Sequence, residues 1–463
     1  MQTADRPTQP TAPLPRTAIL PGDSTYDDAR ISFNGMLDRR PAAIVPCAST
    51  DGVVEAVRAA RSAGLPIAIR GGGHSVAGHG LADDALVVSL SRMRAVLVDP
   101  EARLAHAGGG AQWEDVDNAT TAHGLAVPGG TFVDTGIGGL TLGGGLGWLM
   151  PVAGLTCDNL VEAEVVTGDG SVVIAGPGGD PELLWALRGG GGNFGVVTRF
   201  TYRLTPLRPI VGGRIRYPAA EAAAMVARVH AVLDAHPTAM MPVLAARRDP
   251  DLGPIVSVLF GIVDGSDPAP ILAGLRDDMT VLTDEVGPLT YAELQMFTGI
   301  LPFGLRHYWK GHFIRELDGD LFGALAGEAT ASDAVGQSFV MIEGLTGAVR
   351  SEPEGGAAFG QRAARWNASG LAIWTSPDDD EAGIGWARRI AGLLEPASLT
   401  GGGYVNYSPA DESSERVKAA YGSERWERLV AVKRRYDPDN VFRFNHNIRP
   451  RADGVAELPL GPR

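Results

Sequence analysis

The chain has little of what secreted, membrane-spanning or nucleic-acid-binding proteins depend on. Its 463 residues include only two cysteines, Cys47 and Cys157, so there is no disulfide framework and a reducing, cytoplasmic location is expected. No apolar run reaches the roughly 18 residues of a membrane span, and Met1–Arg16 lacks the apolar core of a signal peptide. Lys and Arg number 40 against 54 Asp and Glu, for a formal charge of -14 without a basic run. Binding to nucleic acid or to a membrane is therefore not expected.

Several catalytic and binding motifs are missing as well. The serine hydrolase elbow G-x-S-x-G does not occur. His74 and His79 lie in a glycine loop without a carboxylate or thiolate at ligand spacing, so no metal site is predicted. Gly190–Gly195 matches G-x-G-x-x-G, but the alternating strand Val196–Leu204 follows it. A dinucleotide fingerprint needs a helix N-terminus at that point, so a Rossmann site is excluded here.

The length and the 44% of hydrophobic residues predict two domains. Ala43–Ile69 has the pattern of a strand, a helix and a strand, and Gly168–Gly170 is typical of a β-hairpin turn. Glycine clusters become rare after about Thr205, which indicates a second domain. We expect, in chain order, a disordered or extended arm, a first domain, a second domain and a C-terminal segment returning to the first, with bounds 1–40, 41–205, 206–400 and 401–463.

The 62 glycines form clusters, as in chains whose backbone must approach a ligand closely. Gly71–Gly73 follow a predicted strand and can offer consecutive N–H groups to an anion such as a pyrophosphate, with the nucleophilic imidazole of His74 beside them. A tight turn with a structural histidine is the alternative. The tract Gly136–Gly147 fits a backbone pressed against a flat ring or a diphosphate better than it fits a solvated loop.

Two further segments carry candidate polar groups. If Tyr404–Tyr407 is a strand, Tyr404 and Asn406 face one side and the other two residues face the opposite side. A core strand with one wet face is the alternative. For Tyr308–Lys310, an aromatic patch that packs a lysine stem is equally compatible with the sequence.

These segments together resemble the berberine bridge enzyme-like oxidoreductases, within the vanillyl-alcohol oxidase type of FAD fold. The resemblance extends from about Ala43 to Ile448 and rests on five motifs in order: Arg70–Ser75, Gly136–Gly147 with Leu155–Leu160, Asn193–Thr198, Tyr404–Tyr407, and Tyr436–Phe442 with Asn445–Ile448. It implies an α+β, two-domain FAD-binding fold whose substrate domain consists of antiparallel sheet and helices.

The resemblance also implies the cofactor and its attachment. His74 would carry FAD through an 8α-histidyl bond. Many family members add a second bond from a cysteine, but Phe132 stands at that position, so a single attachment is expected, as in bacterial oxidases of the 6-hydroxy-D-nicotine oxidase kind. Cys47 and Cys157 are then expected to be buried small hydrophobes. Besides His74, the FAD-binding residues implied are Arg70, Gly71, Gly72, Gly73, Ser75, Thr135, Gly136, Gly138, Gly139, Gly143, Asp158, Asn159, Val197, Asn406, Asn445 and Asn447.

The implied activity is hydride transfer from a small alcohol, amine or secondary metabolite to FAD, and then to molecular oxygen. Tyr404 or Tyr407 would take the substrate proton, with Lys310 as a cation that helps the tyrosine ionise. Thr135 lies near the loop where relatives control access of oxygen. Two alternatives remain open: a flavin-loaded protein that sequesters a natural product, and a dehydrogenase with another acceptor. The oligomeric state is not predicted.

Overall fold

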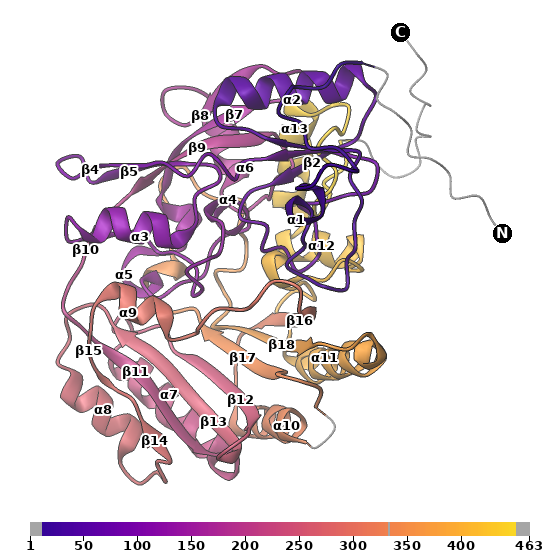
Figure 1. Cartoon of the computed structure of the whole chain (residues 1–463). Helices are drawn as coiled ribbons and strands as arrows, with labels where there is room; N and C mark the ends of the chain where they lie inside the picture. The colour runs from indigo at the N-terminus through magenta and orange to yellow at the C-terminus, as the bar shows by residue number, and fades with distance from the viewer. Residues whose placement is uncertain (1–11, 332–333, 451–463) are drawn as a thin grey trace.

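The computed structural model describes residues 12–331 and 334–450 and divides into two halves (Figure 1). One half contains residues 12 to about 205 together with residues 401–450. The other half contains the segment between them. No helix in the described ranges is long and apolar enough to cross a membrane.

A small parallel sheet opens the first half. Its order is β1-β3-β2, so β3 pairs with both strands of the expected strand-helix-strand unit. Helix α2 begins after Ser49, whose side chain accepts a hydrogen bond from the Gly52 N–H, and it buries Val53 and Val57. The bounds are β1 Ala43–Pro46, α2 Thr50–Ser62, β2 Ile67–Arg70 and β3 Leu86–Ser89.

The second sheet of this half is antiparallel, in the order β4-β5-β9-β7-β8. The expected hairpin forms between β7 and β8, where Val166 pairs with Val172. The strands are β4 Val96–Asp99, β5 Leu104–Gly108, β7 Leu160–Val166, β8 Val172–Ala175 and β9 Val196–Arg203. The helices are α3 Trp113–Thr121, α4 Ile137–Leu142, α5 Met150–Ala153 and α6 Pro181–Leu187, and the short strands β6 Leu125–Ala126 and β10 Thr205–Pro206 pair with each other.

The C-terminal segment packs on this half through α12 Ser414–Tyr421 and α13 Ser423–Tyr436 (Figure 1). Lys433 is fully buried at the contact. Its ammonium group bonds to the Asp437 carboxylate at 2.6 Å and to the carbonyl oxygens of Asn193 and Phe442 at 2.8 and 2.9 Å. This buried cation, with its three oxygen partners, links the segment before β9, which contains Asn193, to the residues that follow α13.

The second half consists of one antiparallel sheet with helices packed against it. Its order is β14-β11-β13-β12-β17-β18-β16, with β15 also paired to β11. The strands are β11 Ile210–Pro218, β12 Val243–Asp249, β13 Gly253–Ile262, β14 Thr283–Asp284, β15 Gly287–Leu289, β16 Arg306–Ile314, β17 Phe339–Gly344 and β18 Trp366–Trp374. The helices are α7 Ala222–Ala235, α8 Pro268–Arg276, α9 Tyr291–Met296, α10 Gly319–Thr330 and α11 Asp380–Leu394.

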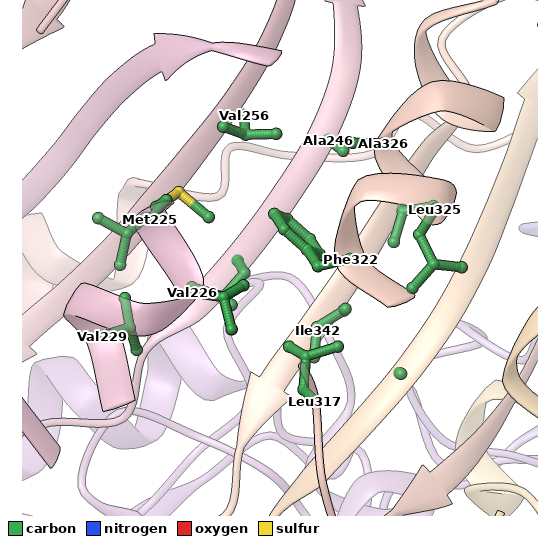
Figure 2. Close-up of a cluster of buried hydrophobic side chains, with 14 of the residues drawn as sticks. Met225, Val226, Val229, Ala246, Val256, Leu317, Phe322, Leu325, Ala326 and Ile342 are labelled. Atoms are coloured by element: carbon green, nitrogen blue, oxygen red, sulfur yellow. The ribbon is translucent and has the colours of Figure 1, made fainter. Parts of the chain in front are cut away.

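The two faces of this sheet follow the alternation of its strands. Figure 2 shows α7 and α10 packing Met225, Val226 and Phe322 against Ala246 and Ile342 of the sheet. Met341, next to Ile342, and Val243, in the strand of Ala246, point the other way and join a separate apolar cluster shared with the first half. The sheet therefore presents its second face to the first half.

Three segments differ from the sequence-based expectation. Of the arm expected over residues 1–40, residues 1–11 lie outside the described residues, whereas the rest packs against both halves. It forms α1 Tyr26–Ala29 and buries Phe33 completely. The tract 136–147 contains the short helix α4. Finally, Val405–Tyr407 is a 3₁₀ turn rather than a strand, so the alternation expected there does not apply.

Candidate active site

A large cavity lies where the two halves meet. The space between its walls is about 1710 Å³ when the open solvent at its mouth is included. Its walls come mainly from the segments 67–80, 130–146, 191–200, 404–408 and 442–446, with Trp309 from β16. Both halves therefore contribute to the walls, the first half more than the second.

Glycines occur in the walls where the chain segments approach each other too closely for a Cβ atom. A Cβ on Gly72 would lie 2.5 Å from the Cα of Gly136, and a Cβ on Gly143 would lie 2.0 Å from Oδ1 of Asn406. By contrast, a Cβ on Gly139 would meet no protein atom within 4 Å, although Gly139 lines the cavity. It would project into the space that a ligand would fill, so the glycine walls fit a ligand that lies directly on the backbone.

The imidazole of His74 is held on three sides. Its Nε2 lies 3.1 Å from the Asp134 carboxylate, its ring stacks on Phe33 at 4.1 Å, and the ring of Phe303 meets it edge-on at 5.6 Å. Phe33 stacks in turn on His307 at 4.4 Å. Burial and the nearby His74 lower the pKa of His307 to about 3, so His307 is a neutral ring here.

Some polar atoms on the cavity wall have no partner in the described part of the chain. They are Nε2 of His79, Nε1 of Trp309 and Oδ1 of Asn445, all buried. Burial, with repulsion from His446, lowers the pKa of His79 to about 3. Arg70 lines the cavity but donates to the carbonyl oxygens of Ala29 and Ile31. Unpartnered buried polar atoms need hydrogen bonds from elsewhere, which a polar cofactor can supply.

The 3₁₀ turn brings the two expected tyrosines together, with their ring centroids 4.9 Å apart. The Tyr404 oxygen accepts hydrogen bonds from the Gly145 N–H and from the Asn406 side chain, each at 2.9 Å. The Tyr407 hydroxyl instead donates to the Glu343 carboxylate at 3.1 Å. The ring of Tyr407 packs edge-on against Trp309 at 5.4 Å. All of these except Glu343 and Gly145 line the cavity.

The structure does not bring Lys310 to this pair. In β16, Trp309 faces the cavity, so the pleat turns Lys310 to the other face of the sheet. There its ammonium group lies 3.1 Å from Glu412, which also binds Arg416 at 2.8 Å. The prediction that Lys310 helps one of these tyrosines to ionise is therefore wrong, because its ammonium group lies on the opposite face of the sheet.

Most of the sixteen further FAD-binding residues expected from the sequence line the cavity, but Asp158, Asn159 and Asn447 do not. Asp158 forms a buried ion pair with Arg362 at 2.6 Å, and Asn159 donates to backbone carbonyls of its own turn. The same turn donates to the glycine tract, since the Thr156 and Cys157 N–H groups bond to the Gly145 and Gly144 carbonyls. These side chains support the glycine wall from behind.

Both cysteines are buried and lie away from the cavity, whereas Phe132 lines it. Burial raises the pKa of Cys47 to about 12 and also raises that of Cys157. Neither thiol is therefore a ready nucleophile. No group of three His, Cys, Asp or Glu side chains able to hold a metal occurs within residues 12–331 and 334–450.

The sequence reasoning missed Asp134 and Glu343. Asp134 stands inside the loop that precedes the glycine tract and could have been noticed as the nearest acid to it. Glu343 follows four apolar residues, Phe339–Ile342, and a lone acid at the end of such a strand is the signal that was available. Its partners Asn367 and Tyr407 lie far away in sequence, so its role needed the fold.

Comparison with known proteins agrees with this geometry. Residues 41–176 match the model of an FAD binding domain, and residues 403–449 match the berberine and berberine-like model. The chain is 32% identical to (R)-6-hydroxynicotine oxidase of Paenarthrobacter nicotinovorans over 93% of this chain and 96% of that protein. An FAD-linked oxidoreductase of Bacillus subtilis is 29% identical over 92% and 95%.

Solved structures agree as well. That of 6-hydroxy-D-nicotine oxidase from Arthrobacter nicotinovorans has a TM-score of 0.84 at 30% identity and covers 94% of this chain and 98% of its own. A variant of berberine bridge enzyme also has a TM-score of 0.84, at 20% identity over 94% and 98%, which concerns the fold alone.

The glycine-walled cavity and the matched FAD-binding domain define the chain as an FAD-linked oxidoreductase with the α+β, two-domain fold of the vanillyl-alcohol oxidase type. Within that class, the chain belongs to the berberine bridge enzyme-like family.

Proposed function

We propose that this oxidoreductase is an oxidase with FAD bonded to His74, acting on a small alcohol, amine or related secondary metabolite with dioxygen as electron acceptor. The observation that carries the proposal is that one cavity is lined both by His74 among glycine walls and by Tyr407, whose hydroxyl has a carboxylate partner. Bound FAD supplies a hydride acceptor. The protein must hold the substrate's C–H bond in place and remove a proton.

For the attachment, we propose that Asp134 sets the reactive state of His74. A carboxylate can only accept a hydrogen bond, so the proton of a neutral His74 ring resides on Nε2, which faces Asp134 at 3.1 Å. The lone pair of Nδ1 is then the nucleophile. A single attachment is supported because Phe132 lines the cavity and neither cysteine does.

For the proton, the contacts favour Tyr407 over Tyr404. The Tyr404 oxygen already has two donors, the Gly145 N–H and the Asn406 amide, and these hold the ring against the glycine wall. The Tyr407 hydroxyl has a proton acceptor behind it and lines the cavity in front. Tyr404 is then a positioning residue and Tyr407 the group that meets the substrate.

Oxygen as acceptor rests on the family's named oxidases, and Thr135, which lines the cavity beside Gly136, is the proposed control point. A cytoplasmic location is supported by two buried cysteines that form no disulfide.

Two measurements test the proposal. The purified protein is precipitated with acid and run on a denaturing gel, where flavin fluorescence in the band is expected for wild type and absent for His74→Ala. A panel of amines and alcohols, starting with 6-hydroxynicotine because of the named relative, is then added without oxygen. Bleaching followed by recolouring in air is the result for an oxidase. Spectral shifts without bleaching would point to a flavin-loaded binding protein, and bleaching without recolouring in air to a dehydrogenase.

A further inference from the structure

The ring of Phe33 lies between two imidazoles. Its centroid is 4.1 Å from that of His74, with 26° between the ring planes, and 4.4 Å from that of His307, with 12° between the planes. Phe33 is completely buried, and the stack runs from His74 in the first half to β16 in the second. Nearly parallel rings at this separation restrict each other's tilt. A residue of the N-terminal arm therefore covers one face of His74.

Backbone hydrogen bonds fix Phe33 beside the segment that leads into β16. The Gly304 N–H donates to the Phe33 carbonyl at 3.0 Å, and the Gly35 N–H donates to the Leu305 carbonyl at 2.7 Å. A Cβ on Gly35 would lie 2.1 Å from the Gly304 carbonyl oxygen, so the two backbones are closer than any larger residue would allow. The place of Phe33 is thus set by the sheet of the second half.

The side chain of Asn34 joins the same arm to the residues that follow His74. Asn34 is buried, and its amide donates to the carbonyl oxygens of Val76 at 2.7 Å and of His307 at 2.9 Å. Its own oxygen accepts from the His307 N–H at 3.0 Å. One side chain therefore bonds both to the loop that carries His74 and to the strand that carries His307. The three rings of the stack are held together by these bonds.

His307 contributes an uncharged ring to this stack. Both of its ring nitrogens are buried and have no partner in the described part of the chain. Unpartnered polar atoms are costly, so burial alone does not explain a histidine at this position. Because the ring is neutral, it gives Phe33 a flat surface without placing a charge near His74.

The stack controls a movement of His74 that Asp134 leaves free. The Asp134 carboxylate contacts only Nε2, at 3.1 Å, and the last side-chain torsion of a histidine has a broad range. One hydrogen bond therefore fixes one atom of the ring but not the ring plane. Phe33 covers a face of the ring, and Phe303 meets it edge-on at 5.6 Å. These contacts set the plane, and with it the direction of Nδ1.

We propose, on the basis of the proposed attachment of FAD to His74, that Phe33 is a positioning residue for that attachment. It fixes the ring plane of His74, so that the lone pair of Nδ1 points at the carbon to which it becomes bonded. Bond formation needs the reacting atoms in contact and aligned, and a ring that turns freely is aligned for only part of the time. The second half of the protein, through Phe33, thereby helps to attach a cofactor held by the first.

The step that Phe33 assists joins Nδ1 to the 8α carbon of FAD. The new bond uses the lone pair of Nδ1. One hydrogen of the 8α methyl group and the hydrogen on Nε2 of His74 leave as protons, and the two electrons of the broken C–H bond remain on the flavin. Dioxygen, the acceptor of the proposed oxidase, takes up these electrons with two protons and leaves as hydrogen peroxide.

The test adds FAD at a series of concentrations to flavin-free protein and follows flavin fluorescence in the denatured band over time. The rate constant at saturating FAD reports on bond formation, and the half-saturating concentration reports on binding. Phe33→Leu stays apolar but lacks a flat ring. We expect its saturating rate constant to fall about 2- to 12-fold, as the loss of one aromatic pair implies, with the half-saturating concentration unchanged. Phe33→Tyr, which keeps a flat ring, should restore most of the rate.

Phe322→Leu is the matched control. Phe322 is also completely buried, but it lies in the core between α10 and the sheet and does not line the cavity. Its replacement should destabilise the protein by a similar amount and leave the coupling rate at the wild-type value. The positioning role is refuted, while the attachment stands, if Phe33→Leu couples within about 1.5-fold of wild type at saturating FAD. It is also refuted if Phe33→Leu slows coupling no more than Phe322→Leu, or changes only the half-saturating concentration.

A second pair of variants covers the case in which Phe33→Leu does not fold. His307→Phe keeps a flat ring behind Phe33 and should couple at the wild-type rate, whereas His307→Leu should couple more slowly. Equal rates for these two variants refute the role of the stack. If wild-type protein supplied with FAD gives no fluorescent band, the attachment to His74 falls, and the role of Phe33 falls with it.

Discussion

Removing the acid beside His74 should slow the attachment of FAD without preventing its binding. In Asp134→Ala the ring keeps its stacking on Phe33 and the edge contact with Phe303, so its place in the cavity is maintained. What is lost is the carboxylate 3.1 Å from Nε2, and with it the preference for a proton on that nitrogen.

The size of the effect follows from that one contact. A hydrogen bond to a charged group in a protein contributes about 1.5–3 kcal/mol. If all of it appears in the barrier to bond formation, coupling slows about 10- to 150-fold. Asp134→Asn, which keeps an oxygen able to accept from Nε2, should show a smaller loss.

The assay adds FAD to flavin-free protein, stops samples with acid over time, and records flavin fluorescence in the gel band. Absorbance of the native sample shows that FAD is bound before coupling. Asp83→Ala removes a half-exposed acid that contacts Arg39 and Arg40 and not His74, and it should couple at the wild-type rate. A coupling rate for Asp134→Ala within about twofold of wild type would refute the reasoning.

Three further predictions concern the ion pair behind the glycine wall, the wall itself and the reaction of the reduced flavin with oxygen. Arg362→Ala leaves the buried Asp158 carboxylate without its cation, and denaturant unfolding should show a loss of about 3–5 kcal/mol. Gly139→Ala places a methyl group where no protein atom lies within 4 Å but where the cavity does, so the flavin-to-protein ratio should fall while the unfolding midpoint of the flavin-free protein stays unchanged. Thr135→Leu should slow reoxidation of the reduced flavin by oxygen in stopped-flow mixing, and an unchanged rate would remove Thr135 from the proposed control of oxygen.

Local signals in the sequence were sufficient for much of the fold. The hairpin at Gly168–Gly170 and the strand-helix-strand unit of Ala43–Ile69 depend on residues close together in the sequence, and both are present. The glycine tracts also line the cavity. This could be predicted, because a missing Cβ is a property of the residue itself and can be read from the sequence. Where the prediction assumed the wrong local geometry, as for the 3₁₀ turn at Val405–Tyr407, the sides on which the side chains lie were wrong too.

By itself, the sequence determined that glycine-rich backbone and His74 stand together in one segment, and it predicted a flat or anionic ligand there from composition and spacing within one loop. Only the tertiary structure decided the partners of the reactive groups. Asp134 reaches His74 across 60 residues, and Glu343 reaches Tyr407 across 64. Lys310 is excluded from the tyrosines by the pleat of β16. Pairing at such separations depends on sheet register and on how the two halves pack, and neither leaves a mark in the local sequence.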